Sequence, residues 1–339
     1  MQENGLSGLK NLGNTCFINS TLQVLSHTPE LNNLFDKDIK LKVKSNIEAT
    51  LFKEWKELFI LLWNKNCVIS PNKFLNTLQM VSKKKDNDLF SGFDQNDLPE
   101  FLIFIIDCFH NSLSREITMT ITGKIENETD KTAVKCYETI KNMYSKDYSE
   151  IWSLFYAIQI TELKSIKTGK TLSLVPEPFF ILNLSIPPKK SPSLIDCFNY
   201  FAEDEILENE NAWLNEETNE KESITKRNTF WSLPNILVID LKRYNNSNRK
   251  NQQLIDFPLE NLDLSPFVTG YKKDEYKYDL YGVCNHSGNV LGGHYTSYVK
   301  TKKNNWYLFN DTLVTKVTTP QSIVSPKAYC LFYRKKRIV

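Results

Sequence analysis

One cysteine in this chain has the surroundings that a thiol nucleophile requires. Cys16 opens an apolar helical pattern directly after the polar pair Asn14-Thr15, which can cap the start of the helix. A thiol at the positive end of a helix is favoured as the thiolate, the form that attacks electrophiles. Cys16 is therefore a candidate nucleophile, although a lone cysteine in a helix is more commonly an inert core residue.

A thiol nucleophile usually takes a histidine as its base, and three of the four histidines have simpler explanations. His27 ends the helix that Cys16 begins, about 16 Å away. His110 ends another apolar helix, where a C-terminal cap is the simpler interpretation. His286 falls in the turn-like Asn285-His286-Ser287-Gly288, which favours an exposed loop residue.

The fourth histidine, His294, follows Gly292-Gly293 and precedes a strand-like run. The glycines allow a second backbone to approach closely, and the strand fixes the direction of the imidazole ring. A later strand-like run leads into Asn310-Asp311, and either side chain could hold the ring by its second nitrogen. Cysteine, histidine and asparagine or aspartate in this chain order are typical of papain-like proteases.

The loop before Cys16 carries a candidate for an oxyanion hole. Asn11 lies five residues before Cys16, and its side-chain amide could donate to an oxyanion beside the backbone N–H of Cys16. Gly8 and Gly13 permit the bends that such a loop needs. Each motif alone is weak evidence, but together their order and contexts predict a cysteine-type catalytic centre.

Composition restricts the other classes of function. The chain has 339 residues with 20 Phe, 15 Tyr and 6 Trp, which predicts a globular protein. Its formal net charge of +2 argues against a nucleic-acid partner bound through a basic face. The most apolar helical stretch, Leu51 to Trp63, contains two lysines and two glutamates, so we expect neither a membrane span nor a membrane partner.

Cysteine usage indicates the compartment. The seven cysteines are odd in number, widely spaced and without a C-x-x-C pair, which fits a reduced protein better than a disulfide framework. The polar N-terminus lacks the pattern of a signal peptide. We therefore expect a protein of the cytoplasm or nucleus, and we expect it to act as a monomer.

Hydrophobic periodicity divides the chain into two parts. Up to about residue 160, apolar residues recur at helical spacing, as in 17–25, 51–63 and 101–109. Strand-like runs dominate the rest of the chain, at 180–186, 236–241, 278–283, 294–299, 306–309 and 329–333. This order predicts an α+β fold with a cleft between two lobes, within a single domain that spans 1–339.

Several segments together resemble the ubiquitin-specific protease family. Gly8 to Leu25 is similar to its cysteine box, Gly282 to Val299 to its histidine box, and Gln95 to Leu102 to its Q-x-D-x-x-E-F-L segment. Leu233-Pro234 through Leu241-Lys242-Arg243-Tyr244 resembles its L-P…L-K-R-F/Y strand. The similarity runs from about Gly8 to about Tyr333, which is nearly the whole chain.

The resemblance implies a papain-like cysteine protease fold, with a helical thumb at about 8–160 and β-rich fingers and palm at about 161–339. It implies cleavage of peptide or isopeptide bonds after the C-terminal Gly-Gly of ubiquitin, with ubiquitin or ubiquitinated proteins as partners. By motif position, Cys16 would be the nucleophile, His294 the general base and acid, and Asn310 the orienting residue. Asp311 would be the alternative third residue, and Asn11 would contribute to the oxyanion hole.

The resemblance also implies substrate contacts. Asp97 and Glu100 match family acids that pair with arginines near the tail of the substrate, and Gln95, Gly293 and Tyr295 lie in the same two motifs. Asp-x-x-Glu at a helix start is also the pattern of a capping box, and the two roles are compatible. The proline between the two acids departs from the motif, but proline is tolerated in a first helical turn.

One family feature is missing. Many family members carry two C-x-x-C pairs that bind zinc in the fingers, and the matching segments here, about 166–169 and 215–218, contain no cysteine. We therefore expect no structural zinc, and no other metal or cofactor. The fingers must then be held by packing and strand pairing alone, or be shortened or mobile.

Two other functions stay open on the sequence. The same fold could serve as a non-catalytic ubiquitin-binding scaffold, because the missing cysteines show that family features can be lost. The protein could also cleave another ubiquitin-like modifier, because such modifiers share the chemistry of the tail. The intact set of Cys16, His294 and Asn310 argues against the scaffold.

Overall fold

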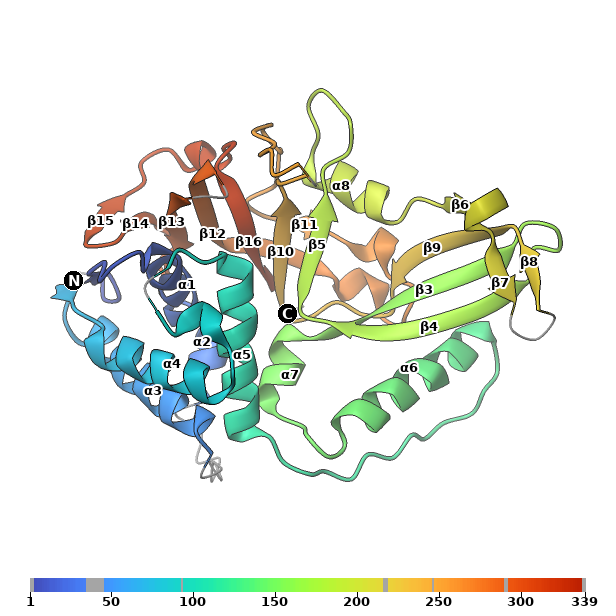
Figure 1. Ribbon diagram of the computed structural model, residues 1–339, viewed down its shortest axis with the longest axis horizontal. Helices are drawn as coiled ribbons and strands as arrows, with labels where there is room; N and C mark the ends of the chain where they lie inside the picture. Colours follow the sequence, from blue (N-terminus) through green and yellow to red (C-terminus); the bar gives the residue numbers. More distant parts are fainter. Residues whose placement is uncertain are drawn as a thin grey trace.

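The computed structural model describes residues 3–34, 46–92, 94–215, 219–245, 247–289 and 292–336. A helical lobe, the thumb (α1–α5), packs against a large sheet, the palm (β5 and β10–β16), and a smaller sheet, the fingers (β3, β4 and β6–β9), extends away on the other side (Figure 1). The helices are α1 Cys16–Ser26, α2 Pro29–Asn32, α3 Glu48–Asn64, α4 Asn72–Lys84, α5 Leu98–Leu113, α6 Glu128–Tyr144, α7 Glu150–Phe155 and α8 Leu194–Phe201, with 3-10 turns η1 Asp88–Phe90, η2 Asn209–Asn211, η3 Ser265–Phe267, η4 Lys273–Glu275 and η5 Pro320–Ile323. The strands are β1 Gly8–Leu9, β2 Val68–Ile69, β3 Ala157–Ser165, β4 Thr171–Phe179, β5 Ile181–Ser185, β6 Glu205–Leu207, β7 Trp213–Asn215, β8 Glu220–Glu222, β9 Ile224–Phe230, β10 Ile236–Lys242, β11 Leu262–Asp263, β12 Lys277–Asn289, β13 Gly292–Lys300, β14 Trp306–Asn310, β15 Leu313–Lys316 and β16 Ala328–Lys335.

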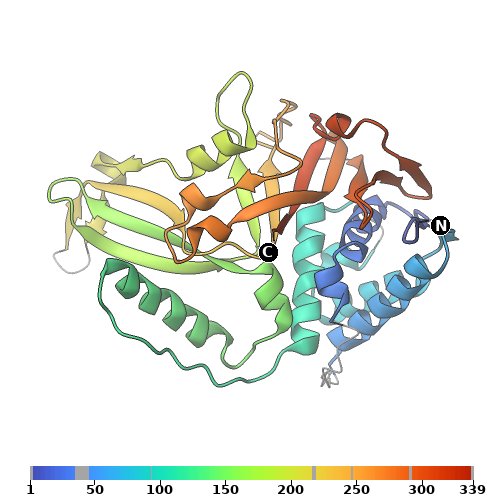
Figure 2. The same ribbon diagram turned by 180° about the vertical axis from the view of Figure 1, so that it is seen from behind.

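The thumb is built around α1, every residue of which is buried. Its apolar side chains reach in both directions because α1 lies between α5 and strand β13 of the palm (Figure 2). The Phe17 ring meets Phe101 of α5 edge-on at 5.5 Å, and Trp55 of α3 stacks on Phe109 at 6.2 Å. The helices predicted from periodicity are confirmed as α1, α3 and α5. No helix in the described part of the chain is long and apolar enough to cross a membrane.

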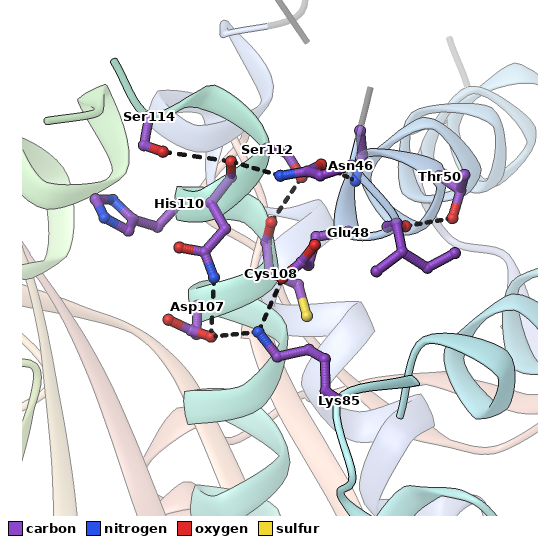
Figure 3. A network of polar contacts seen from close by, with 12 residues as sticks. Asn46, Glu48, Thr50, Lys85, Asp107, Cys108, His110, Ser112 and Ser114 are labelled. Atoms are coloured by element: carbon purple, nitrogen blue, oxygen red, sulfur yellow. Dashed lines mark hydrogen bonds and ion pairs between the residues drawn. The ribbon is translucent and has the colours of Figure 1, made fainter. Parts of the chain in front are cut away.

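A polar network ties three thumb helices together (Figure 3). Lys85, at the end of α4, contacts Glu48 of α3 at 3.0 Å and Asp107 of α5 at 3.1 Å. Asn111 donates to the same Asp107 carboxylate, and Asn46 donates to the backbone carbonyl of Asn111. One ammonium group therefore links α3, α4 and α5 at the edge of their apolar core.

The palm sheet has the strand order β15-β14-β13-β12-β16-β10-β5, with β11 beside β12. Its strands include all six runs predicted from the sequence. The turn expected at 285–288 is wrong, because these residues continue β12, which pairs with β13 as far as Asn289↔Gly292. His286 is only 5% exposed, not a loop residue, because its ring lies against the Tyr295 ring at 4.5 Å.

The fingers are held by strand pairing. Their main sheet has the order β4-β3-β9-β6, and β7 pairs with β8. Residues 166–169, where zinc ligands would be expected, form the turn between β3 and β4. Among the residues that the structure describes, no group of His, Cys, Asp and Glu could hold a metal ion. Helix α6 packs against β4 on the outer side of this sheet (Figure 1).

Thumb and palm share one apolar core. The cluster that contains Phe17 and Trp55 of the thumb also contains Val238, Cys284 and Phe332 of the palm. The helical part ends slightly earlier than expected, since α7 stops at Phe155 and β3 begins at Ala157. The shared core holds the segment before Cys16 and the strand of His294 at one seam between the two lobes.

Candidate active site

Cys16 is the first residue of α1 and is 3% exposed. The predicted side-chain cap by Asn14-Thr15 is wrong. Thr15 is the N-cap residue, but its hydroxyl accepts from the backbone N–H of Leu12 at 3.0 Å and caps no N–H of the helix. Asn14 has a left-handed φ of 54°, which turns the loop into the helix. The chain thus reaches Cys16 through a tight loop in which Thr15 pairs with Leu12 and not with the helix.

The start of α1 favours ionisation of the Cys16 thiol, as expected, but other effects outweigh it in the free protein. Burial raises the pKa of the Cys16 thiol above its usual value, and the negative charge of Asp311 raises it further. The backbone N–H groups of Tyr295 and Phe17 hydrogen-bond to the sulfur and lower the pKa, but they do not outweigh the burial. The helix terminus therefore does not keep the thiol ionised without substrate.

His294 lies on β13 and is held by Asn310 at the end of β14. Its Nε2 is 2.7 Å from Oδ1 of Asn310, so Nε2–H donates to the amide oxygen and Nδ1 is left with its lone pair. Tyr295, the next residue, places its backbone N–H on the Cys16 sulfur. Within the part of the chain that the structure describes, no hydrogen bond joins the Cys16 sulfur directly to the His294 ring.

Asp311 faces away from His294. Its φ of 49° is left-handed and turns its side chain toward the thumb. There its carboxylate accepts from Nδ2 of Asn11 at 3.0 Å and from Nδ2 of Asn19 at 2.7 Å. Of the two candidates for the third residue, the structure therefore brings Asn310 to the imidazole and Asp311 to the cysteine loop.

Asn11 is held at both ends of its amide. Its oxygen accepts from the backbone N–H groups of Gly13 at 3.2 Å and Thr15 at 3.1 Å, while its Nδ2 donates to Asp311. An amide nitrogen carries two hydrogens, so one N–H remains for another acceptor. The loop before Cys16 and Asp311 thus fix the orientation of the Asn11 amide, the expected oxyanion donor.

Gln95 connects the thumb to the backbone beside His294. Its Oε1 accepts from the N–H of Gly293 at 2.6 Å and its Nε2 donates to the carbonyl of Gly293 at 3.1 Å. A side chain at Gly293 is impossible without a shift, because a Cβ there would lie 2.2 Å from Nε2 of His286. The glycine therefore lets Gln95 and His286 approach the strand of His294 from two sides.

The predicted capping box at Asp97 and Glu100 is wrong. Asp97 is the N-cap residue of α5 but makes no side-chain cap. Its carboxylate accepts instead from the hydroxyls of Tyr295 at 3.0 Å and Tyr329 at 3.1 Å, across the seam between the lobes. Burial raises the pKa of the Asp97 carboxyl. Partial desolvation and the nearby charge of Asp97 raise the pKa of Glu100, on the first turn of α5, although that residue as a whole is exposed.

A groove of about 490 Å³ lies between thumb and palm. Gln95, Asp97 and Tyr295 of the expected set line it, whereas Glu100, Gly293, Cys16 and His294 do not. Sequence reasoning missed Asp240 of β10, where burial raises the carboxyl pKa to about 7. The sequence did contain a sign of this residue, because Asp240 interrupts the otherwise apolar strand run 236–241.

Comparison with known proteins agrees with this geometry. A model of the ubiquitin carboxyl-terminal hydrolase family matches residues 7–333. Human ubiquitin carboxyl-terminal hydrolase 2 is 33% identical over 343 residues, covering 97% of this chain and 55% of the relative. Ubiquitin carboxyl-terminal hydrolase 4 of Saccharomyces cerevisiae is 31% identical over 367 residues, covering 97% of this chain and 39% of the relative. The chain therefore spans about half the length, or less, of these curated relatives.

Solved structures show the same fold. The SAGA Ubp8/Sgf11/Sus1/Sgf73 DUB module bound to ubiquitin aldehyde matches with a TM-score of 0.74 at 23% identity, covering 99% of this chain and 70% of that one. A form of that module bound to monoubiquitin matches with a TM-score of 0.76, also at 23% identity and with the same coverage. The mixed helix-and-sheet arrangement is the papain-like fold that the family resemblance implied.

Proposed function

Because the chain belongs to the ubiquitin carboxyl-terminal hydrolase family, we propose that it is a thiol-dependent hydrolase that cleaves peptide and isopeptide bonds after the C-terminal Gly-Gly of ubiquitin. The observation that carries the proposal is the contact between Nε2 of His294 and Oδ1 of Asn310, on two strands that pack against the helix of Cys16. This arrangement brings a thiol, a base and an orienting amide to one seam. Ubiquitin is the substrate class that the names of the relatives support.

In the proposed reaction, the Cys16 thiol transfers its proton to Nδ1 of His294, and the sulfur attacks the carbonyl carbon of the last glycine. Asn310 keeps the ring oriented by accepting from Nε2–H. The imidazolium then protonates the leaving amine, and the carbon–nitrogen bond breaks. Water hydrolyses the thioester after His294 takes its proton, which releases the glycine carboxylate and the free thiol.

The oxyanion of the tetrahedral intermediate needs donors near Cys16. The backbone N–H of Cys16, at the open start of α1, is one candidate, and the second N–H of Asn11 is the other. Asp311 holds the first Asn11 N–H, and the loop N–H groups hold its oxygen. The amide therefore has few orientations to lose when the intermediate forms, which reduces the reorganisation in that step.

Ionisation of the pair would depend on substrate. The raised pKa of Cys16 means that the thiol is neutral in the free protein near neutral pH. When a peptide tail fills the seam and brings His294 to hydrogen-bonding distance of the sulfur, the imidazolium formed stabilises the thiolate. The thiolate of Cys16 and the imidazolium of His294 would then form together only when the substrate's scissile bond is in place.

The groove between the lobes supports a basic tail as substrate. Asp97 and Asp240 line it together with Lys242 and Arg243, and Glu100 follows Asp97 by three residues outside the lining. Each of the three carboxyls has a raised pKa because of burial and, for Glu100 and Asp240, the nearby charge of Asp97. A cationic side chain placed between them would relieve that repulsion. Gln95, Gly293 and Tyr295 would contact the backbone of the same tail, and only glycine residues would pass the narrow approach to Cys16.

We also propose that the described region acts as a single catalytic unit, as a monomer, in the cytoplasm or nucleus. The shared core of thumb and palm supports one unit. All seven cysteines are free thiols, six of them buried, which supports a reducing compartment.

A ubiquitin probe with a C-terminal electrophile tests the activity. Wild-type protein should form a covalent adduct, and Cys16→Ala should not, while Cys67→Ala, which removes the exposed thiol, serves as the matched control. Failure of the wild type to react, together with measurable ubiquitin binding, would show a scaffold instead. Faster reaction with a probe built on another ubiquitin-like modifier would show that the substrate is that modifier.

A further inference from the structure

The groove between thumb and palm is lined by a histidine that the proposed mechanism does not use. His286 lies on β12 directly opposite Tyr295 of β13, and both residues line the groove. Their rings are 4.5 Å apart, because opposite residues of paired strands point to the same face of a sheet. Since Tyr295 follows His294 in the chain, His286 lies on the strand beside the candidate catalytic histidine.

Lys250 fixes the tautomer of the His286 ring. Its ammonium group is 3.0 Å from Nδ1 of His286 and donates to the backbone carbonyl of the same residue at 2.7 Å. An ammonium group can only donate, so Nδ1 is the acceptor and the ring proton is on Nε2. Burial and the nearby charge of Lys250 lower the pKa of His286 to about 4, so the ring is neutral at pH values near 7. Lys250 itself stays charged there, since burial lowers its pKa only to about 8.

The Nε2–H group of His286 has no acceptor among the residues that the structure describes. The hydrogen bonds of this ring are all made by Nδ1. Nε2 is also absent from the side-chain atoms that are both unpaired and fully buried, so this donor is accessible. It lies beside Gly293, where a Cβ would be only 2.2 Å away from it. The groove is therefore lined by a free donor next to the glycine that precedes His294.

The three tyrosines that line the groove with His286 already have partners. Tyr295 and Tyr329 donate their hydroxyls to Asp97 at 3.0 and 3.1 Å, and the hydroxyl of Tyr244 is 3.2 Å from Nδ1 of His286. A peptide that enters the groove loses water from its backbone carbonyls, and each carbonyl then needs a donor. The tyrosines are committed to the protein, whereas His286 has its Nε2–H left for a ligand.

We propose that His286 is a substrate-binding residue whose Nε2–H donates to a backbone carbonyl at the glycine end of the tail, and that Lys250 is the positioning residue that holds this donor. The inference rests on the proposed function, because it takes the ubiquitin tail as the occupant of the groove. The place of Nε2 beside Gly293 favours the terminal glycines as its partner. A donor that is fixed before binding loses little freedom when the complex forms.

Binding of ubiquitin to the Cys16→Ala protein tests the contact without any turnover. The ligands are full-length ubiquitin and ubiquitin without its C-terminal Gly-Gly, measured by calorimetry, with chemical-shift titration for the weaker ligand. His286→Phe keeps a ring beside Tyr295 and removes the donor, so it should weaken binding of full-length ubiquitin roughly tenfold. Binding of the shortened ubiquitin should not change, because the carbonyl that accepts from Nε2–H is missing.

Two amide variants of the same residue form a matched pair. His286→Gln can place an amide N–H near the position of Nε2, whereas the shorter side chain of His286→Asn cannot reach it. The glutamine variant should bind full-length ubiquitin within about threefold of the parent, and the asparagine variant should lose about as much as His286→Phe. In the protein with Cys16 restored, His286→Phe should raise KM and leave kcat nearly unchanged, because the bond exists in the ground state as well as in the transition state.

The role of Lys250 has its own spectroscopic test. Nitrogen chemical shifts of the His286 ring near neutral pH should show a proton on Nε2 and none on Nδ1 in the parent protein. Lys250→Met should abolish this single tautomer, and Lys250→Arg, which keeps a donor, should restore it. A ring that carries its proton on Nδ1 in the parent would overturn the assignment of the donor.

Other results would also overturn the proposal. An equal loss of affinity for full-length and shortened ubiquitin in His286→Phe would show that the ring only packs against Tyr295. Unchanged binding of full-length ubiquitin by His286→Phe, or equal binding by the glutamine and asparagine variants, would exclude the contact. The amide pair decides the question even if His286→Phe does not fold. A parent that binds ubiquitin but does not cleave it with Cys16 restored would contradict the hydrolase activity and not this contact.

Discussion

Asn310 and Asp311 are neighbours in the chain, yet their side chains form hydrogen bonds with opposite lobes. Asn310 holds His294 of the palm at 2.7 Å, while Asp311 holds Asn19 of α1 at 2.7 Å and Asn11 of the cysteine loop at 3.0 Å. The left-handed φ of 49° at Asp311 points its side chain away from that of Asn310. One dipeptide at the end of β14 therefore sets the spacing between the strand of His294 and the helix of Cys16.

Replacing these two neighbours should have different consequences. Asn310→Ala removes the acceptor for Nε2–H of His294, so kcat for a fluorogenic ubiquitin substrate should fall roughly 10- to 100-fold with little change in KM. Asp311→Ala releases Asn11 and Asn19, so it should lower kcat and also reduce the free energy of unfolding by about 1–2 kcal/mol. Denaturant titration gives the second quantity, and equal stability of the two variants would contradict the separate roles.

The charge of Asp311 should also influence the ionisation of Cys16, the candidate nucleophile. It raises the pKa of the Cys16 thiol, after burial, so Asp311→Asn should shift that pKa downward. The measurement is the pH dependence of alkylation by iodoacetamide in a Cys67→Ser background, because Cys67 is the exposed thiol. Asp274→Asn removes an exposed acid on η4 and should leave the pH midpoint of alkylation unchanged. A midpoint that stays or rises in Asp311→Asn would exclude this coupling.

Asp240 should make stability depend on pH. Burial raises its pKa from 3.8 to about 7, so between these values the folded protein binds more protons than the unfolded chain. The free energy of unfolding therefore decreases as pH rises through this window, and the decrease is complete above about pH 7. Asp240→Asn mimics the protonated form and should raise Tm at about pH 8 but hardly at about pH 4. An equal change in Tm at both pH values would refute the assignment.

The thumb network of Figure 3 should contribute modestly to stability. Lys85→Met removes the ammonium that links Glu48 and Asp107, and the two carboxylates then lose their common partner. We expect a loss of about 1 kcal/mol in the free energy of unfolding, because the partners are partly exposed to water. Lys84→Met on the same helix, whose side chain is exposed, should be neutral. A matching loss in both variants would mean that the apolar replacement, not the network, is responsible.

The fingers should not depend on a metal. The segments that correspond to zinc ligands contain no cysteine, and strand pairing of β3 with β4 and β9 runs up to the turn. Purified protein should therefore carry well under one equivalent of zinc by elemental analysis. Treatment with a chelator should leave Tm unchanged. Stoichiometric zinc, or a lower Tm after chelation, would show that other ligands replace the cysteines.

Features with a local cause could be predicted from the sequence. Periodicity found α1, α3 and α5, and the glycines before His294 and the strand end at Asn310 pointed to the paired strands β13 and β14. Features with a distant cause could not. The hydroxyls that hold Asp97 come from residues 198 and 232 positions away, so a capping box was the natural local interpretation.

Backbone geometry explains the other failures. The burial of His286 depends on β12 continuing through an apparent turn to pair with β13, and the direction of Asp311 depends on a left-handed φ. Neither has a signal in residue type alone. The raised pKa of Cys16 has the same origin, because burial by the palm opposes the helix terminus and cannot be read from the helix alone.

The bonds between Gln95 and Gly293 bear on how a peptide tail would enter. Gln95 pairs through one donor and one acceptor with the N–H and carbonyl of a single glycine, as an adjacent strand would. The backbone of an incoming glycine presents the same donor and acceptor. A tail glycine that takes over the donor and acceptor of Gln95 would release the N–H and carbonyl of Gly293, so the strand of His294 would need new partners at that point, from the tail itself or from water.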